Sequence, residues 1–158
     1  MNSHDNQIHT MPVANTKPEL HRVLCVDDEP AICFAYSRLF ENERFGFDIC
    51  ESIEAARTLL KTNDYFAVIS DVRFAGTNNE DGIYFVSVVR KEQPQAKIIL
   101  VTGYGSEELK NTVQLLGTTH YFEKPIKPSV ILELLNSLHL KIHEKERAEF
   151  GNLLPEQT

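Results

Sequence analysis

The chain has 158 residues, enough for one domain with a full core, and its 42% hydrophobic and 25% charged residues are ordinary for a soluble globular protein. The formal net charge of −7 argues against nucleic acid as a partner, and no apolar run approaches the roughly 20 residues that span a bilayer. Because the polar N-terminus lacks the apolar core of a secretory signal, we expect a cytoplasmic protein with no membrane partner.

Apolar runs of strand length begin after residues 1–20, a polar and aperiodic segment that we expect to be a flexible arm. Five runs are expected to be strands: Arg22–Asp27, Phe47–Cys50, Tyr65–Ser70, Lys97–Val101 and Thr118–Phe122. Gly46 is expected to break the chain before the second strand. The third run is apolar at nearly every position, which indicates burial on both faces.

Segments with apolar residues at helical spacing follow each of these strands. Pro30 suits the first turn of the first helix, and three later helices have serines as expected N-caps: Ser52, Ser106 and Ser129. The last helix is expected to run to about Phe150, past the body of the domain. The alternation predicts an α/β fold, a doubly wound five-stranded parallel sheet with five helices and an extended C-terminal helix.

Four of the expected strands end at residues that suit magnesium-assisted phosphoryl transfer. The first ends in Asp27-Asp28, the third in Asp71 and the fourth in Thr102, and the fifth leads into Lys124. Because the carboxyl ends of parallel strands share one edge of a sheet, three carboxylates, a hydroxyl and an ammonium should meet in one crevice.

The acidic cluster predicts a bound cation. Three neighbouring carboxylates repel one another, and a divalent cation offsets the repulsion; oxygen ligands favour Mg²⁺. A carboxylate can then act as the nucleophile and form an aspartyl phosphate, with Thr102 and Lys124 beside the phosphoryl oxygens. Taken singly, an acid at a strand end is more often a helix N-cap and Lys124 a solvated lysine, but the combination favours the phosphoryl site.

The combination resembles the receiver domain of two-component response regulators over about residues 21–140. The matching pieces are Asp27-Asp28, Asp71, Thr102-Gly103 and Lys124-Pro125. The resemblance implies a flavodoxin-like fold and a stand-alone phosphorelay receiver rather than an enzyme. It divides the chain into the arm at 1–20, the receiver domain at 21–140, and a helical extension with a polar tail at 141–158.

The resemblance also implies the residues that carry out phosphorylation. Asp71 would accept the phosphoryl group from a histidine kinase or a histidine phosphotransfer protein. Magnesium would be held by Asp27, Asp28, Asp71 and the backbone carbonyl of Arg73. Lys124 would pair with the acceptor and later with the phosphoryl oxygens.

Three further residues are implied as parts of a switch. Thr102 would swing towards the new phosphate, Gly103 leaves open space beside the acceptor, and Tyr121 would turn inward when Thr102 moves. The surface of the fourth helix, fifth strand and fifth helix would then change its preference for a downstream protein. The extended last helix is either solvated or a contact for a homodimer or another partner.

One part of the chain departs from the family. Phe74-Ala75 stands where receivers commonly have Met-Pro, and the loop 74–80 is longer than usual. The departure removes no catalytic group, but it leaves open which partner docks at this loop.

Two other functions remain open from the residues alone: a Mg²⁺-dependent phosphatase with an aspartate nucleophile, and a receiver that signals without phosphorylation. Phosphatases of the haloacid-dehalogenase type need two aspartates one residue apart after the first strand, whereas Asp27 and Asp28 are adjacent. A nucleotide-binding module is disfavoured because only the weak pattern Gly103-x-Gly105 is present.

The histidines and cysteines are not expected to build a second site. His139 and His143 stand four apart on a predicted helix and could touch one metal, but the sequence shows no third ligand, and His21 is expected to be solvated. The cysteines match no metal or disulfide pattern and are expected to be small buried hydrophobes in a reducing compartment: Cys25, Cys33 and Cys50.

Overall fold

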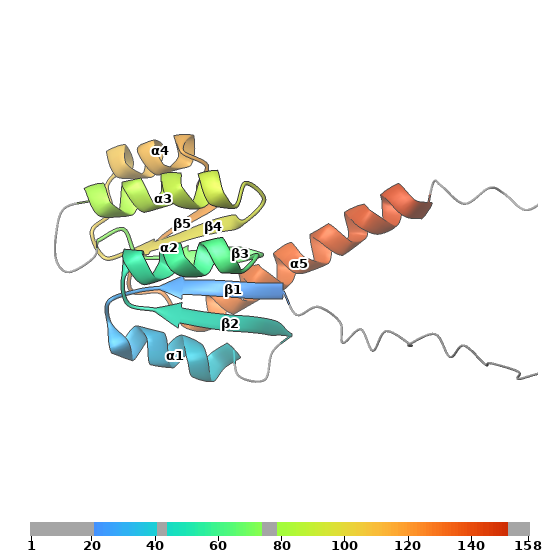
Figure 1. The fold of residues 1–158 in the computed structure, drawn as a ribbon, viewed down its shortest axis with the longest axis horizontal. Coiled ribbons are helices and arrows are strands. Elements are labelled where there is room, and N and C mark those ends of the chain that lie inside the picture. Colours follow the sequence, from blue (N-terminus) through green and yellow to red (C-terminus); the bar gives the residue numbers. More distant parts are fainter. Residues whose placement is uncertain (1–20, 41–43, 74–78, 152–158) are drawn as a thin grey trace, which may run out of the picture.

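The computed structural model describes residues 21–40, 44–73 and 79–151, in which five strands alternate with five helices (Figure 1). In chain order they are β1 (His21–Val26), α1 (Pro30–Phe40), β2 (Phe45–Cys50), α2 (Ile53–Thr62), β3 (Ala67–Ser70), α3 (Glu80–Glu92), β4 (Lys97–Thr102), α4 (Glu107–Leu115), β5 (His120–Glu123) and α5 (Pro128–Gly151).

The five strands form one parallel sheet in the order β2-β1-β3-β4-β5. Helices α1 and α5 cover one face, and α2, α3 and α4 cover the other (Figure 1). This arrangement confirms the doubly wound α/β fold. The chain runs outward from β1 to β2 and then crosses back to β3, so the carboxyl ends of β1 and β3 flank the point where such sheets bind ligands.

The central strands are buried on both faces, as expected for a parallel sheet between two helical layers. In β1, Val23 and Cys25 face α1 and α5, whereas Leu24 and Val26 face α2, α3 and α4. This alternation follows from the two-residue period of a strand. The apolar side chains on each face of the sheet pack with the helices into one cluster, and these two clusters hold the carboxyl ends of the strands in fixed positions.

Two of the three predicted serine caps are confirmed. The Ser52 hydroxyl accepts a hydrogen bond from the Ala55 backbone N–H at 3.2 Å, and the Ser106 hydroxyl accepts one from Leu109 at 3.1 Å. The cap at Ser129 is wrong, because α5 already begins one residue earlier, at Pro128. Proline fits the first helical position since its ring fixes φ and the missing N–H has no partner there in any case.

The predicted break at Gly46 is also wrong. Strand β2 begins at Phe45, and Gly46 is paired with Arg22 within the ladder. Phe45 is buried and its ring lies 6.4 Å from that of Phe40 and 5.9 Å from that of Phe66. Burial of an aromatic side chain against both neighbours outweighs the weak strand propensity of one glycine.

Helix α5 continues to Gly151 and projects beyond the sheet (Figure 1). Its buried residues are Ile131, Leu135 and His139, so the last turns have no buried side chain. Among the described residues, no helix combines the length and apolarity that crossing a membrane requires. The arm at 1–20 and the tail beyond 151 lie outside the described residues, and the domain boundaries stay predictions.

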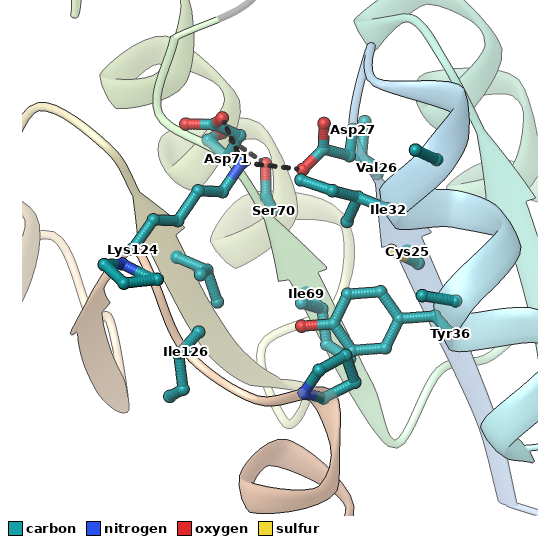
Figure 2. Close-up of a pocket in the computed structure, with 15 residues that line it drawn as sticks. Cys25, Val26, Asp27, Ile32, Tyr36, Ile69, Ser70, Asp71, Lys124 and Ile126 are labelled. Carbon is teal, nitrogen blue, oxygen red and sulfur yellow. Dashed lines mark hydrogen bonds and ion pairs between the residues drawn. The ribbon is translucent and has the colours of Figure 1, made fainter.

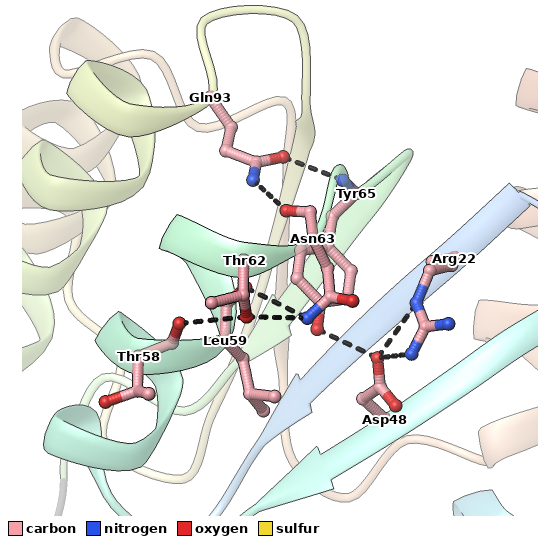
Figure 3. Close-up of polar contacts among 8 residues, drawn as sticks. All are labelled: Arg22, Asp48, Thr58, Leu59, Thr62, Asn63, Tyr65 and Gln93. Carbon is pink, nitrogen blue, oxygen red and sulfur yellow. Dashed lines mark hydrogen bonds and ion pairs between the residues drawn. The ribbon is translucent and has the colours of Figure 1, made fainter.

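A polar network lies at the amino ends of the strands, at the opposite edge of the sheet from the acidic residues (Figure 3). The buried Gln93 side chain accepts from the Tyr65 backbone N–H at 2.7 Å and donates to the carbonyls of Leu60 and Asn63. The Tyr65 hydroxyl donates to Asp48 at 2.8 Å, which also accepts from Arg22. Gln93 thereby ties the end of α3 to the loop between α2 and β3.

Candidate functional site

Two acidic residues extend the neighbouring strands β1 and β3. Asp27 and Asp71 are 4% and 7% exposed, and each continues its ladder through its backbone: the Asp27 N–H donates to Cys50 and the Asp71 N–H donates to Val26, both at 3.2 Å. Their positions therefore follow from strand pairing. The half-buried Asp28 comes directly after Asp27.

Three carboxylates converge at this edge, because one oxygen each of Asp27, Asp28 and Asp71 lies within 4.8 Å of the other two. Backbone N–H groups orient two of them: Glu29 donates to Asp27 Oδ1 at 2.9 Å, and Arg73 donates to Asp71 Oδ1 at 3.0 Å. Burial raises the pKa of Asp27, and Asp71 adds to the rise, although the Glu29 N–H and Lys124 oppose it. Burial of Asp27 therefore disfavours its charged form at this edge of the sheet.

Lys124, which follows β5, joins two of these acids (Figure 2). Its Nζ lies 3.0 Å from Asp71 Oδ2, 3.2 Å from Asp27 Oδ2 and 3.6 Å from Glu29 Oε1. Burial alone would lower the pKa of Lys124, but Asp71 and Asp27 outweigh it and the pKa is raised. The lysine is therefore charged and held at the acids. The sequence did not predict that Glu29 would lie close to Lys124.

Asp27, Asp71 and Lys124 line a cavity of about 360 Å³ whose other walls are largely apolar (Figure 2). Tyr36 of α1, Ile69 of β3 and Ile126 form part of these walls. Apolar walls lower the local dielectric, so charge interactions at the cavity mouth are stronger than in open water.

The Arg73 side chain contacts Asn79 and Tyr104. Its Nε donates to Asn79 Oδ1 at 3.1 Å, and its guanidinium lies 4.0 Å from the centre of the Tyr104 ring. These contacts connect the segment after Asp71 to the segment after β4. The predicted metal contact of the Arg73 carbonyl stays a prediction, and residues 74–78 of the long loop lie outside the described residues.

Thr102 ends β4 and Tyr121 lies in the neighbouring strand β5, and the Thr102 carbonyl accepts a hydrogen bond from the Lys124 backbone N–H at 2.8 Å. Thr102 is fully buried at the end of β4, and its hydroxyl accepts from the Tyr104 N–H at 3.2 Å. The Tyr121 hydroxyl is buried without a hydrogen-bond partner among the described residues. Burial, and then Glu123, raises the pKa of Tyr121. The nearby Ser106 backbone opposes this rise in pKa, although it makes no well-formed hydrogen bond to the Tyr121 hydroxyl.

The glycines of the site differ in what surrounds them. A Cβ on Gly103 would meet nothing within 4 Å, and the role of Gly103 beside the acceptor stays a prediction. A Cβ on Gly105 would lie 2.7 Å from the Tyr121 hydroxyl, and one on Gly82 would lie 2.1 Å from the carbonyl oxygen of Val72. Gly82 therefore lets α3 approach the backbone next to Asp71. In the sequence, the only indication of this role for Gly82 is its position directly after Asp81.

Comparison with known proteins decides the family. A family model described as the response regulator receiver domain matches residues 23–136. The chain belongs to this family. As a receiver domain it is a signalling domain. The family typically uses Mg²⁺ at an acidic pocket, and this chain has a cluster of three carboxylates.

Curated relatives of this receiver domain are longer proteins. It is 27% identical over 113 residues to the photosynthetic apparatus regulatory protein RegA of Rhodobacter capsulatus. The matched region covers 72% of this chain and 60% of RegA. It is 25% identical over 115 residues to the transcriptional regulatory protein FixJ of Bradyrhizobium diazoefficiens, covering 73% of this chain and 55% of FixJ. The chain thus spans less than two thirds of these relatives.

Solved structures show the same receiver fold. A CheY-like receiver domain protein from Methanospirillum hungatei is 27% identical, with a TM-score of 0.71 over 80% of this chain and 98% of that one. The beryllofluoride-activated NtrC4 receiver domain dimer is 26% identical, with a TM-score of 0.66 over 74% of this chain and 94% of that one.

Proposed function

We propose that this receiver domain takes a phosphoryl group onto Asp71 from a phosphohistidine of a histidine kinase or a histidine phosphotransfer protein. The observation that carries the proposal is the contact of Lys124 Nζ with Asp71 Oδ2 at 3.0 Å, in a pocket that also gathers Asp27 and Asp28. An Asp71 oxygen attacks phosphorus, the P–N bond breaks, and the imidazole leaves and takes up a proton.

The pocket fits magnesium by its donor set. Asp27, Asp28 and Asp71 offer three hard carboxylate oxygens within 4.8 Å of one another, and the Arg73 carbonyl is the proposed fourth protein ligand. When bound, the cation neutralises the acids and the charge on the phosphoryl oxygens. The Arg73 N–H holds Asp71 Oδ1, and Lys124 holds Oδ2, so the attacking carboxylate is oriented by this chain's own groups.

The proposed switch uses Thr102 and Tyr121. Phosphorylation adds about −1.5 to −2 charges and three strong acceptors beside Lys124. The Thr102 hydroxyl leaves the Tyr104 N–H for the phosphoryl oxygens, and open space at Gly103 lets the loop follow. Tyr121, whose hydroxyl has no hydrogen-bond partner among the described residues, then settles further beneath the loop at Gly105.

Output is proposed to be protein–protein contact through α4, β5 and α5. Leu115 of α4 is 90% exposed and Leu140 of α5 is exposed as well, which suits a partner-binding surface. A downstream protein or a second copy of this chain would bind there, and the NtrC4 receiver neighbour is a dimer. The free, buried thiols are consistent with a reducing cytoplasm.

Incubation of the protein with Mg²⁺ and acetyl phosphate, followed by intact mass, tests the proposal. We expect one added phosphoryl group, lost in Asp71→Asn and kept in the matched control Asp64→Asn, whose side chain is exposed. No added mass with either acetyl phosphate or a phosphorylated kinase would favour a receiver that signals without phosphorylation. Many turnovers of p-nitrophenyl phosphate per site would instead indicate a phosphatase, so we expect no such turnover.

A further inference from the structure

Three histidines meet at the end of the sheet opposite the acidic pocket. His21 begins β1, and His139 and His143 lie one turn apart on α5. One ring nitrogen of each lies within 4.8 Å of the other two. Since His21 and Asp27 occupy opposite ends of β1, the histidines lie about 20 Å from the acids along the strand.

Ring contacts hold the buried imidazole of His139 in place. The His139 ring centre lies 4.8 Å from that of His21 and 4.4 Å from that of His143, both in edge-to-face arrangements. The ring centres of Phe66 and Phe45 also lie close to that of His139, at 6.4 Å and 5.9 Å. This packing fixes the buried imidazole, while the half-buried His21 and the exposed His143 leave the cluster open to solvent.

The buried histidine has an unused polar atom. His139 is 9% exposed, and its Nδ1 is buried without a hydrogen-bond partner among the described residues. A buried polar atom without a partner is costly and calls for a ligand. Burial, followed by His143 and His21, lowers the pKa of His139.

A carboxylate orients the most exposed member. His143 Nδ1 lies 3.3 Å from Glu146 Oε2, which leaves Nε2 of His143 for a cation. A carboxylate on the second ring nitrogen is the usual support of a metal-binding histidine. The positive charge of Arg44 near His139 works against a cation, and Glu146 works in its favour.

We propose that His21, His139 and His143 bind Zn²⁺ or a similar first-row transition metal, with a fourth position open to water. Three imidazoles suit these borderline metals and not Mg²⁺, which requires oxygen ligands, so the two ends of the sheet would select different ions. Tetrahedral coordination needs ligand nitrogens about 3.3 Å apart, which rotation of the two less buried rings can supply. The metal would fasten α5 to the start of β1.

The test uses the full chain without a histidine tag, in a background with His4→Gln and His9→Gln, which removes the histidines of the arm. Zn²⁺ titration calorimetry should show one equivalent bound, and Co²⁺ should give the visible spectrum of a four-coordinate nitrogen site. His143→Gln and His21→Gln should each weaken Zn²⁺ binding at least about tenfold, and Glu146→Gln about tenfold. The control His120→Gln, at a histidine of β5 outside the cluster, should bind as before.

Thermal unfolding gives a second readout. A hundredfold excess of Zn²⁺ over its Kd should raise Tm by about 5 °C or more, and this shift should vanish in His143→Gln, whose exposed side chain can be replaced without disturbing the core. Asp28→Asn should keep the Zn²⁺ shift, which separates this site from the acidic pocket. Binding that persists in both histidine variants, or that disappears in Asp28→Asn, would overturn the proposal.

Discussion

The Lys124 ammonium lies 3.0 Å from the Asp71 carboxylate. The two residues follow β5 and β3, which do not pair with each other because β4 lies between them. The same ammonium lies 3.2 Å from Asp27, which follows β1. The side chain that follows the last strand therefore bridges two acids that would otherwise repel each other at the switch point of the sheet.

Removing this bridge should destabilise the fold. We expect Lys124→Ala to lower the free energy of unfolding by about 2 kcal/mol at pH 7, measured by urea denaturation, because two buried acids lose their counter-charge. The loss should shrink at acid pH, where the carboxylates are neutral. Since the pKa of Lys124 is raised on folding, the contribution of its charge is also lost as the pH rises through that value. An equal loss in the exposed control Lys127→Ala would contradict this account.

Asp27 should have the opposite effect on stability. Burial raises its pKa, so the folded state binds the proton more tightly than the unfolded state, and the ionised form costs stability at neutral pH. Asp27→Asn keeps an acceptor for the Glu29 N–H and removes the charge. We expect a higher free energy of unfolding at pH 7, with the gain fading as the pH falls from the raised pKa of Asp27 to the ordinary pKa of an aspartate, below which it is absent. Asp64→Asn should show no such gain; a loss in Asp27→Asn would refute the prediction.

Two glycines of the site should respond differently to the same change. A Cβ at Gly82 would collide with the Val72 backbone, which cannot yield, whereas one at Gly103 would meet nothing within 4 Å. We expect Gly82→Ala to cost about 2–3 kcal/mol and Gly103→Ala to stay within about 0.5 kcal/mol of the parent by urea denaturation. Similar values for both variants would mean that α3 does not approach Val72 this closely.

The proposed switch predicts that Thr102 transmits phosphorylation to Tyr121. Thr102→Ala should still take up a phosphoryl group at Asp71, but Mg²⁺ with beryllofluoride should no longer change the environment of Tyr121. ¹⁹F NMR of fluorotyrosine-labelled protein reports this, with the resonance assigned by Tyr121→Phe. The control Thr58→Ala, exposed on α2, should respond like the parent. A persisting Tyr121 shift in Thr102→Ala would remove the hydroxyl from the switch.

The parts of the fold that depend on local sequence could be predicted, and the exceptions have a tertiary cause. Ser52 and Ser106 cap helices through bonds to residues three positions on, which the sequence shows directly. Gly46 was misjudged because its place in β2 depends on the burial of Phe45, and Ser129 because proline also suits a first turn.

The same reasoning applies to the candidate sites. The proximity of Asp27, Asp71 and Lys124 could be predicted because the carboxyl ends of parallel strands lie at one edge of the sheet. Their catalytic roles stay predictions. His21 was expected to be solvated, yet it lies beside His139, because only the docking of α5 against β1 joins residues so far apart in sequence.

Gln93 shows what sequence patterns cannot reveal, because nothing distinguishes it from the nearby Gln95. Gln93 is 8% exposed and bonds to Tyr65, Leu60 and Asn63, whereas Gln95 is exposed. We expect Gln93→Ala to lower the free energy of unfolding by about 2–3 kcal/mol, since three backbone groups lose a buried partner, and Gln95→Ala by less than about 0.5 kcal/mol. Urea denaturation measures both, and hydrogen exchange at the Tyr65 amide should accelerate only in Gln93→Ala. Unchanged protection of that amide would mean that water replaces the side chain without cost.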